Sequence, residues 1–212
     1  MLNMGEITYF TQEEYASFRE KIKTLHTKKM SVEKIQLMFD VLCSGAMRVN
    51  EVLDLEPDDI LNDGRIRIKR AKGGWKRCTC STWKFRPTVL ISSKSDCNKC
   101  KGVGKYRVYQ YTFLPEAILA ILKQFAELVP KGTKIFPISD RQVLNYVDEL
   151  AGGRTHAFRH SWLTWLVQSN KVDLARVRDM ARHTSLATTD RYVQRNPALT
   201  RQEVTDVSKD FI

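Results

Sequence analysis

The sequence contains no run of eighteen apolar residues, so none of its segments predicts a transmembrane helix. The opening MLNMGEITYF lacks the basic stretch and following apolar stretch of a secretory signal. Internal repeats and low-complexity tracts are also absent, and hydrophobic residues make up 42% of the 212 positions, which suffices for an ordinary core. We therefore expect a folded intracellular protein of one domain, or at most two small ones, without a membrane partner.

Acidic residues are almost absent from one segment of the chain. From Arg65 to Tyr109 there are fourteen Lys or Arg and a single acid, Asp96, whereas the remainder holds 21 basic and 23 acidic residues. The net charge of +11 therefore originates in this segment, which is either a solvated basic loop or a surface for a polyanion such as nucleic acid. The candidate nucleic-acid contacts are Arg65, Arg67, Lys69, Arg70, Lys76, Arg77, Lys84 and Arg86.

Cysteine is scarce outside the same segment, which holds four of the five cysteines. Their order is C-x-C, sixteen residues, then C-x-x-C followed by KGVGKY, which resembles half of a zinc knuckle. Four thiolates would close a tetrahedral structural zinc site with no open position for catalysis, while a redox pair and metal-free thiols remain alternatives. The predicted zinc ligands are Cys78, Cys80, Cys97 and Cys100.

Helical patterns dominate the rest of the chain. Capping residues and apolar spacing predict helices that begin near Thr11, Ser31, Arg48, Pro115, Asp140, Thr155 and Asp173. Residues 64–70 alternate and predict a strand whose return partner is 105–114. We therefore predict an α+β fold, mainly helical, with one small antiparallel sheet and a basic, cysteine-rich, zinc-ribbon-like insert at 73–104 within its hairpin.

The side chains capable of chemistry fall mainly on the predicted helices. In HAFRH, His156 and Arg159 are three residues apart and share a helix face, whereas His160 lies on a different face from Arg159 and is interpreted as structural or as a support for a catalytic residue. Arg48 begins the third predicted helix, and Tyr192 follows His183 by nine positions in RHTSLATTDRY. Taken singly, such residues are more typical of a helix surface or a core than of an active site.

Taken together, these residues resemble the catalytic domain of the tyrosine recombinases, the phage-integrase family. The family's first box, T-G-x-R-x-x-E-x-x-x-L, corresponds to SGAMRVNEVLDL, with Arg48 and Glu51, and its hairpin lysine corresponds best to Lys72 in RAKGG. Its H-x-x-R-H box is HAFRH, and its last box, G-H-x-x-x-x-T-T-x-x-Y, is RHTSLATTDRY. Two positions depart from the pattern: Arg182 stands where glycine is usual, and Ala157 stands where an acid is usual.

The resemblance implies a DNA strand-exchange enzyme of the integrase type. Tyr192 would attack the scissile phosphate and form a 3′-phosphotyrosine, while Arg48 and Arg159 would clamp the phosphoryl oxygens with forked, permanently charged donors. His156 would accept a proton or orient a partner, His183 would donate to a phosphate oxygen, and Lys72 would protonate the departing 5′-oxygen. The phosphotyrosine conserves the bond energy, so neither a nucleotide cofactor nor a catalytic metal is implied, and any zinc is structural.

The same resemblance sets the expected organisation and partners. Members of the family commonly carry an N-terminal core-binding domain that clamps DNA, and here the pattern begins at about Thr11, so we expect residues 1–212 to form a single catalytic domain without it. The sequence is then either an excised catalytic part of a longer protein or a minimal, single-domain member of the family. The expected partners are double-stranded DNA and further copies of the chain in a tetramer on DNA, in the cytoplasm, or in the host cytoplasm for a phage-encoded protein. Two alternatives remain: relaxation of DNA of the topoisomerase IB type, and a non-catalytic, zinc-stabilised DNA-binding regulator.

Overall fold

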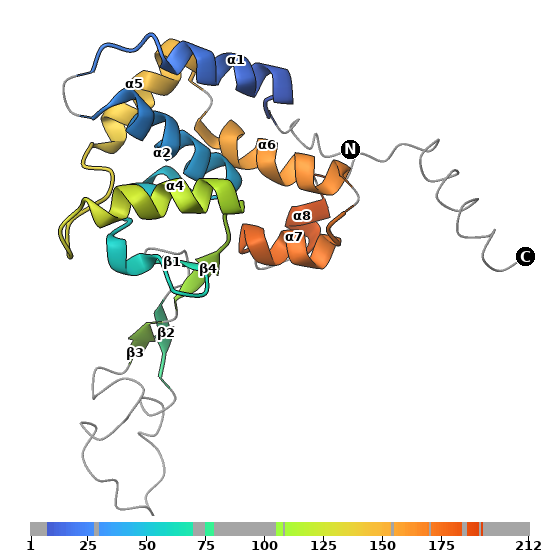
Figure 1. Cartoon of the computed structure of the whole chain (residues 1–212). Helices are drawn as coiled ribbons and strands as arrows, with labels where there is room; N and C mark the ends of the chain where they lie inside the picture. The colour runs from blue at the N-terminus through green and yellow to red at the C-terminus, as the bar shows by residue number, and fades with distance from the viewer. Residues whose placement is uncertain are drawn as a thin grey trace, which may run out of the picture.

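The computed structural model describes residues 8–27, 30–69, 75–78, 105–107, 109–153, 155–169, 171–183, 186–190 and 192 (Figure 1). In chain order the elements are α1 (Gln12–Ile22), α2 (Val32–Ser44), α3 (Val49–Leu53), the 3-10 turn η1 (Pro57–Asp59), β1 (Ile66–Ile68), β2 (Trp75–Arg77), β3 (Lys105–Arg107), β4 (Gln110–Thr112), α4 (Glu116–Glu127), α5 (Asp140–Ala151), α6 (Thr155–Gln168), α7 (Leu174–Ala181) and α8 (Leu186–Asp190). None of the helices in these ranges is long and apolar enough to cross a membrane.

Helix α2 is the centre of the fold. It packs against α1, α3, α4 and α6, and its buried side chains face several directions, as expected of a helix that is apolar on most of its surface. Phe39 is fully buried on this helix and lies in edge or tilted contact with Phe18 of α1 and Phe158 of α6. Because α6 is pressed against α2 by these rings, the residues near the start of α6 are held close to the C-terminal end of α2.

Local sequence signals account for the helix ends. Thr11 and Glu14 form the predicted capping box of α1, and Ser31 caps α2 through its side chain. The cap of α5 is Ser139 rather than Asp140, which instead occupies the first helical position. At the other end of α5, Gly152 adopts a left-handed conformation, with φ of 65°, that favours glycine. The prediction of a mainly helical fold is confirmed, although η1 and the short α8 were not predicted.

The predicted pairing of residues 64–70 with 105–114 is confirmed by β1 and β4, and a second strand pair is present beside it. Strand β1 pairs antiparallel with β4, with Ile66 opposite Thr112, whereas β2 pairs with β3, with Trp75 opposite Arg107. The predicted return strand 105–114 therefore serves two different partners along its length. In Figure 1 the β1–β4 pair lies beside the helices, and the β2–β3 pair extends away from them. Two antiparallel pairs thus replace the one small sheet of the prediction.

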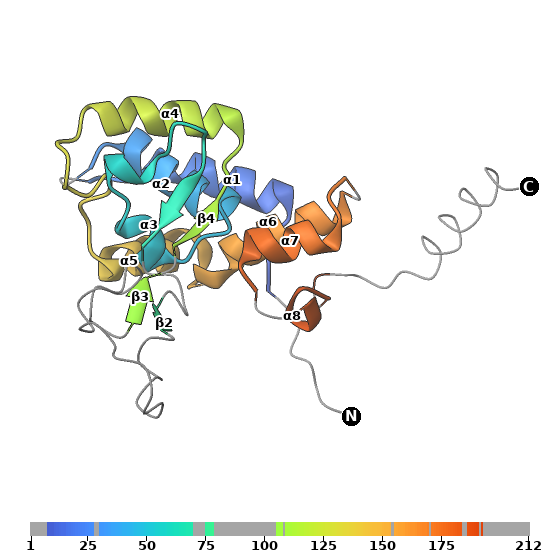
Figure 2. The same cartoon turned by 90° about the horizontal axis from the view of Figure 1, so that it is seen from below.

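The last three helices lie together at one side of the molecule. Figure 2 shows α7 and α8 next to α6, in agreement with the packing of α6 on α7 and of α7 on α8. A second apolar cluster forms there from Leu163 of α6, Val177 and Ala181 of α7, Ala46 and Tyr192. The nucleophile predicted from the sequence thus belongs to the packed interior of this region.

Candidate active site

The turn that follows α2 organises the site. Gly45 ends the helix, and a Cβ at this position would lie 2.8 Å from the carbonyl oxygen of Val41, so the turn requires glycine. The Thr112 hydroxyl of β4 donates to the Gly45 carbonyl at 2.8 Å, which ties the sheet to the turn. Ala46 follows with a φ of 45°, and its carbonyl oxygen is thereby presented to α6 and α7. A strained turn of this kind fixes one backbone acceptor at the junction of three elements.

Arg159 reaches this turn from α6. Its guanidinium donates one N–H to the Ala46 carbonyl and another to the carbonyl of Ala181 at the end of α7. Arg159 is only 6% exposed. Two backbone carbonyls fix its side chain, and the other N–H groups of the guanidinium take no part in these two hydrogen bonds. Burial and the neighbouring guanidiniums of Arg182 and Arg48 lower the pKa of Arg159 to about 10, which still leaves it charged at neutral pH.

Glu51 of α3 lies between two further guanidiniums. Its Oε1 accepts from Nη1 of Arg48 at 2.7 Å, and its Oε2 accepts from Nη2 of Arg182 at 2.6 Å. The side chains of Glu51 and Arg182 are 2% and 3% exposed, whereas that of Arg48 is 38% exposed. Arg182 also donates to the Ala46 carbonyl at 3.1 Å, the same acceptor that Arg159 uses. One carboxylate and one carbonyl thus hold three arginines together.

The positive charge in this cluster exceeds the negative charge. Two of the three guanidiniums, those of Arg48 and Arg182, pair with the carboxylate of Glu51, whereas that of Arg159 donates to backbone carbonyls. Burial lowers the pKa of Arg182, and the charge of Arg48 lowers it further, although Glu51 opposes both effects. An uncompensated pair of guanidiniums in a partly buried site favours an anion with several oxygens, such as a phosphodiester.

Tyr192 lies beside this cluster and is 4% exposed. Its hydroxyl oxygen is 2.6 Å from Nδ1 of His160, and its ring stacks on that of His183 with centroids 6.2 Å apart. Nδ1 of His183 is in turn 2.9 Å from the hydroxyl of Thr189 in α8. Burial and then the charge of Arg159 lower the pKa of His183 to about 4, with smaller contributions from other neighbours, so its imidazole is neutral at pH 7.

The structure brings five of the six predicted catalytic positions into one region. Arg48, Arg159, His183 and Tyr192 are linked by the contacts above, and His156 lies one helical turn from His160, with ring centroids 6.4 Å apart. His156 is exposed, in contrast to Arg159 on the same helix. The sixth position, Lys72, lies in the sequence between β1 and β2 and outside the described residues.

The contacts of two residues of the site were not predicted from the sequence. His160, which we placed in the HAFRH box and interpreted as structural or as a support for a catalytic residue, contacts the hydroxyl of Tyr192. Its spacing of four residues from His156 was the available signal, because positions i and i+4 of a helix share a face. Arg182, noted only as a departure from glycine, has a φ of 57° in the left-handed region and still inserts its side chain between Glu51 and Ala46. Nothing in the local sequence indicated that this arginine would point inward.

The predicted metal ligands fall largely outside the described residues. Cys78, directly after β2, is 1% exposed, whereas Cys80, Cys97 and Cys100 are not among the residues that the structure describes. Within the described ranges, no group of three His, Cys, Asp or Glu side chains is arranged to hold a metal ion. Cys43, predicted to be buried, is 2% exposed, and burial raises the pKa of its thiol. The structural zinc therefore stays a prediction.

Three of the candidate nucleic-acid contacts are in ion pairs near the first strand. Arg65 pairs with Asp63, Arg67 pairs with Asp59, and Lys69 lies within 2.9 Å of carboxylate oxygens of both Glu56 and Asp59. Lys76 on β2 is exposed. The side chains of the remaining candidates, Arg70, Arg77, Lys84 and Arg86, are outside the described part of the chain. The DNA-contact prediction therefore stays a prediction, with three of its cations already paired to acids.

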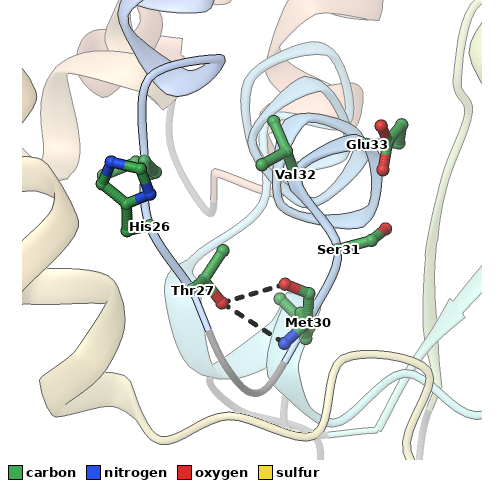
Figure 3. A pocket seen from close by; sticks show the side chains of 7 residues that line it. His26, Thr27, Met30, Ser31, Val32 and Glu33 are labelled. Atoms are coloured by element: carbon green, nitrogen blue, oxygen red, sulfur yellow. Dashed lines mark hydrogen bonds between the residues drawn. The ribbon is translucent and has the colours of Figure 1, made fainter.

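A surface recess lies at the opposite end of α2 from the arginines. It has a volume of about 450 Å³ and is lined by residues of the α1–α2 connection, including His26, Thr27 and Met30 (Figure 3). The Thr27 hydroxyl donates to the Met30 carbonyl at 2.9 Å and accepts from the Met30 N–H at 3.4 Å, which closes the loop on itself. Helix α2 has 13 residues, a length of about 20 Å, so this recess is separate from the active-site cluster.

Several solved structures share this fold. The Tn1549 transposon integrase in complex with circular intermediate DNA matches with a TM-score of 0.64 and 13% identity, over 97% of this chain and 68% of that one. The XerA recombinase matches with a TM-score of 0.59 and 15% identity, over 95% of this chain and 65% of that one. The XerH site-specific recombinase bound to its difH substrate matches with a TM-score of 0.60 and 20% identity, over 96% of this chain and 55% of that one.

The remaining comparisons concern sequence. A search of curated proteins found no match to this chain. The chain spans 65% of the XerA chain and 55% of the XerH chain that it resembles in structure. The model of the phage integrase family matches residues 8–198, which is nearly the whole sequence and includes every residue of the cluster built above. By this match, the chain belongs to the phage integrase family.

Proposed function

We propose that this protein carries out site-specific DNA strand exchange through a 3′-phosphotyrosine intermediate, without a nucleotide cofactor or a catalytic metal. The observation that supports it is the placement of a buried tyrosine hydroxyl and two histidines beside three guanidiniums, of which two pair with one carboxylate and the third donates to backbone carbonyls. Transesterification of a phosphodiester requires a nucleophile, positive charge around the non-bridging oxygens and a proton for the leaving oxygen. In this proposal Tyr192 supplies the nucleophile and the guanidiniums of Arg48 and Arg159 supply the positive charge.

Each residue has a defined part in the proposed reaction. Tyr192 forms a bond to the phosphorus and releases the 5′-oxygen, while Arg48 and Arg159 bind the non-bridging oxygens. Arg159 is held in place by the carbonyls of Ala46 and Ala181, so it needs little reorganisation when DNA arrives. His183 is neutral and can donate one ring N–H to a phosphate oxygen. Lys72 protonates the departing oxygen in this scheme, and His156 orients or exchanges a proton nearby.

The partners follow from this reaction. Exchange between two duplexes requires four strands to be cut and resealed, so we propose double-stranded DNA and a tetramer of this chain on it. Two of the structurally similar proteins, XerH and the Tn1549 integrase, were solved with DNA, which supports the choice of partner. The chain's own target sequence is to be found by covalent capture, in which random duplexes that become attached to the protein are recovered and sequenced.

Covalent trapping tests the proposed chemistry directly. Wild-type protein and Tyr192→Phe are incubated with supercoiled plasmid in EDTA, quenched with detergent, and analysed with and without protease. We expect protein-linked nicked DNA with the wild type and none with Tyr192→Phe, whose fold should be unchanged because only a hydroxyl is removed. Equal product from both proteins would show that Tyr192 is not the nucleophile. Relaxed plasmid without strand exchange between two captured sites would favour the topoisomerase alternative.

We also propose that residues 73–104 form a basic insert stabilised by one structural zinc ion and that this insert contacts DNA. The thiolates would come from Cys78, Cys80, Cys97 and Cys100, and the burial of Cys78 fits a closed site. Metal analysis of purified protein should give one zinc per chain, lost in a Cys97→Ser/Cys100→Ser variant and retained in Cys43→Ser. Deleting residues 78–100 should weaken DNA binding and flatten its salt dependence, and unchanged affinity would contradict the role of the insert.

A further inference from the structure

His160 lies within hydrogen-bond distance of the hydroxyl of Tyr192. Its Nδ1 is 2.6 Å from the phenolic oxygen, and the two ring centroids are 5.6 Å apart. In the family pattern quoted above, His156 and not His160 carries the proton-handling role. The described residues include no hydrogen bond between His156 and Tyr192, and His156 is exposed to solvent. The geometry therefore singles out a different histidine as the neighbour of the reacting oxygen.

The surroundings of His160 keep its imidazole neutral. Burial lowers its pKa, and the charges of His156 and Arg159, which lie on the same helix, lower it further. From the neighbouring elements it faces Tyr192 and His183, whose rings stack on each other. A neutral imidazole has one nitrogen that accepts a hydrogen bond, and a phenol is protonated at neutral pH. The 2.6 Å contact is then a bond in which Tyr192 donates to Nδ1 of His160, with the ring proton on Nε2.

We propose that His160 accepts the phenolic proton of Tyr192 during DNA cleavage. This inference rests on the proposed function. As the tyrosine oxygen forms its bond to phosphorus, the proton moves to Nδ1, the bond from phosphorus to the 5′-oxygen breaks, and that oxygen takes a separate proton from Lys72. In the resealing step the incoming 5′-hydroxyl gives its proton to Lys72 and attacks phosphorus, the phosphorus–tyrosine bond breaks, and His160 returns its proton to the phenolate. His156 is then left to contact the phosphate or the DNA backbone.

The first test needs no DNA. The protein has four histidines, so ¹⁵N-imidazole NMR can resolve each ring in the wild type and in Tyr192→Phe. We expect His160 to be neutral at pH 7 with its proton on Nε2, and we expect loss of the tyrosine hydroxyl to shift the Nδ1 resonance of His160 while His26 is unchanged. A proton on Nδ1 in the wild type, or no response to Tyr192→Phe, would overturn the proposal whatever the activity of the enzyme.

The second test separates a proton acceptor from a structural residue. Single-turnover cleavage of the captured duplex is measured against pH for wild type, His160→Gln, His160→Asn and the remote control His26→Gln. A general base contributes about 10²- to 10⁴-fold, so we expect a loss of this size at pH 7 that narrows as pH rises toward the pKa of a free phenol. An equal loss at every pH would indicate a structural role, and wild-type rates in both variants would reject His160 while leaving the proposed function intact.

A sulfur-substituted substrate distinguishes the two proton transfers. When the 5′-bridging oxygen of the captured duplex is replaced by sulfur, the leaving thiolate no longer needs a proton donor. We expect this substrate to rescue Lys72→Ala but not His160→Gln, because the nucleophile still carries its proton. Rescue of both variants would contradict the assignment of His160 to the nucleophile side. Urea denaturation of each variant confirms that the compared proteins are folded.

Discussion

Two groups of basic side chains in this protein differ in how their charge is balanced. The sheet cluster, defined as Arg65, Arg67 and Lys69, is matched by three carboxylates, those of Asp63, Asp59 and Glu56. Hydrogen bonding to Asp59 raises the pKa of Arg67, which marks a satisfied ion pair. Arg65 and Arg67 also lie over the rings of Tyr111 and Tyr109. In the sequence these cations belong to the basic segment, but in the fold neighbouring carboxylates largely neutralise their charge.

The site cluster, defined as Arg48, Arg159 and Arg182, has the opposite balance. Only two of its three guanidiniums pair with a carboxylate, that of Glu51, and the pKa values of Arg159 and Arg182 are lowered rather than raised. The rest of the chain outside the basic segment carries slightly more acid than base, yet it contains this excess of positive charge. Net charge along the sequence therefore does not locate the site cluster, because acids close in the sequence pair with every cation of the sheet cluster, whereas the described ion pairs of the site cluster involve Glu51 alone.

The largest expected effect comes from removing the single acid of the site cluster. Glu51→Gln leaves the guanidinium of Arg182, which is 3% exposed, without its charged partner. Breaking a buried ion pair from one side typically costs about 3–5 kcal/mol of unfolding free energy. Asp63→Asn, which breaks the exposed pair with Arg65, should cost at most about 1 kcal/mol. Urea denaturation of the two variants measures both, and similar losses would show that the two clusters are equivalent.

A smaller effect is expected at Arg182, where backbone and side chain act in opposite directions. Arg182→Ala removes one partner of Glu51 but leaves Arg48 in place, so we expect a loss of about 2 kcal/mol, below that of Glu51→Gln. Arg182→Gly removes the same side chain and also relieves the left-handed backbone, with φ of 57°, which costs a non-glycine residue about 1 kcal/mol or more. Glycine should therefore be the more stable of the two variants, and the reverse order would contradict the backbone argument.

Much of the fold was accessible from the sequence because its signals are local. The capping box at Thr11 and Glu14, the cap at Ser31 and the glycine at position 152 each act within a few residues. The division of the return strand between β1 and β2 was not accessible, since register depends on which segments meet across a long connection. The predicted single sheet was therefore too simple.

The site could be predicted in its residues but not in its contacts. Sequence order placed Arg48, Arg159, His183 and Tyr192 in recognisable boxes, but not the shared Ala46 carbonyl, which depends on a left-handed turn more than a hundred residues from Arg159. Helix geometry placed His160 off the face of Arg159, and it is the contact with Tyr192, 32 residues later, that gives this histidine its neighbour. Both contacts depend on tertiary packing, which no local sequence pattern predicts.

The salt dependence of DNA binding tests whether the ion pairs of the sheet cluster reduce its contribution to DNA contacts. Each phosphate contact changes the slope of log affinity against log salt by about 0.9, so Lys76→Gln, at an exposed position, should reduce the slope by about 1. Arg67→Gln should reduce it less, because Asp59 already neutralises this guanidinium. Fluorescence anisotropy over a range of salt concentrations provides the slopes, with Lys23→Gln on α1 as the control. A larger change for Arg67 than for Lys76 would show that DNA displaces Asp59.

The pKa of His183 responds to the excess charge of the site cluster. Its folded pKa of about 4 lies below the value of about 6.5 for an unfolded histidine, so the folded state resists protonation. The stability that this contributes is complete above pH 6.5 and is lost as pH falls toward 4. Stability curves of wild type and His183→Gln should therefore run parallel above pH 6.5, and the wild type should lose stability relative to the variant below it.

Arg48→Gln tests the origin of that shift. Burial is the largest cause of the low pKa of His183, and the charge of Arg48 is a smaller one, so the variant should raise the pKa by less than one unit. Arg65→Gln removes an equal charge from the sheet cluster and should leave the pKa unchanged, since Asp63 already compensates it. An NMR titration of the His183 ring measures both variants. An equal rise in both would mean that His183 responds to overall charge, whereas a rise only in Arg48→Gln ties its neutrality to the same guanidiniums that would hold the phosphate.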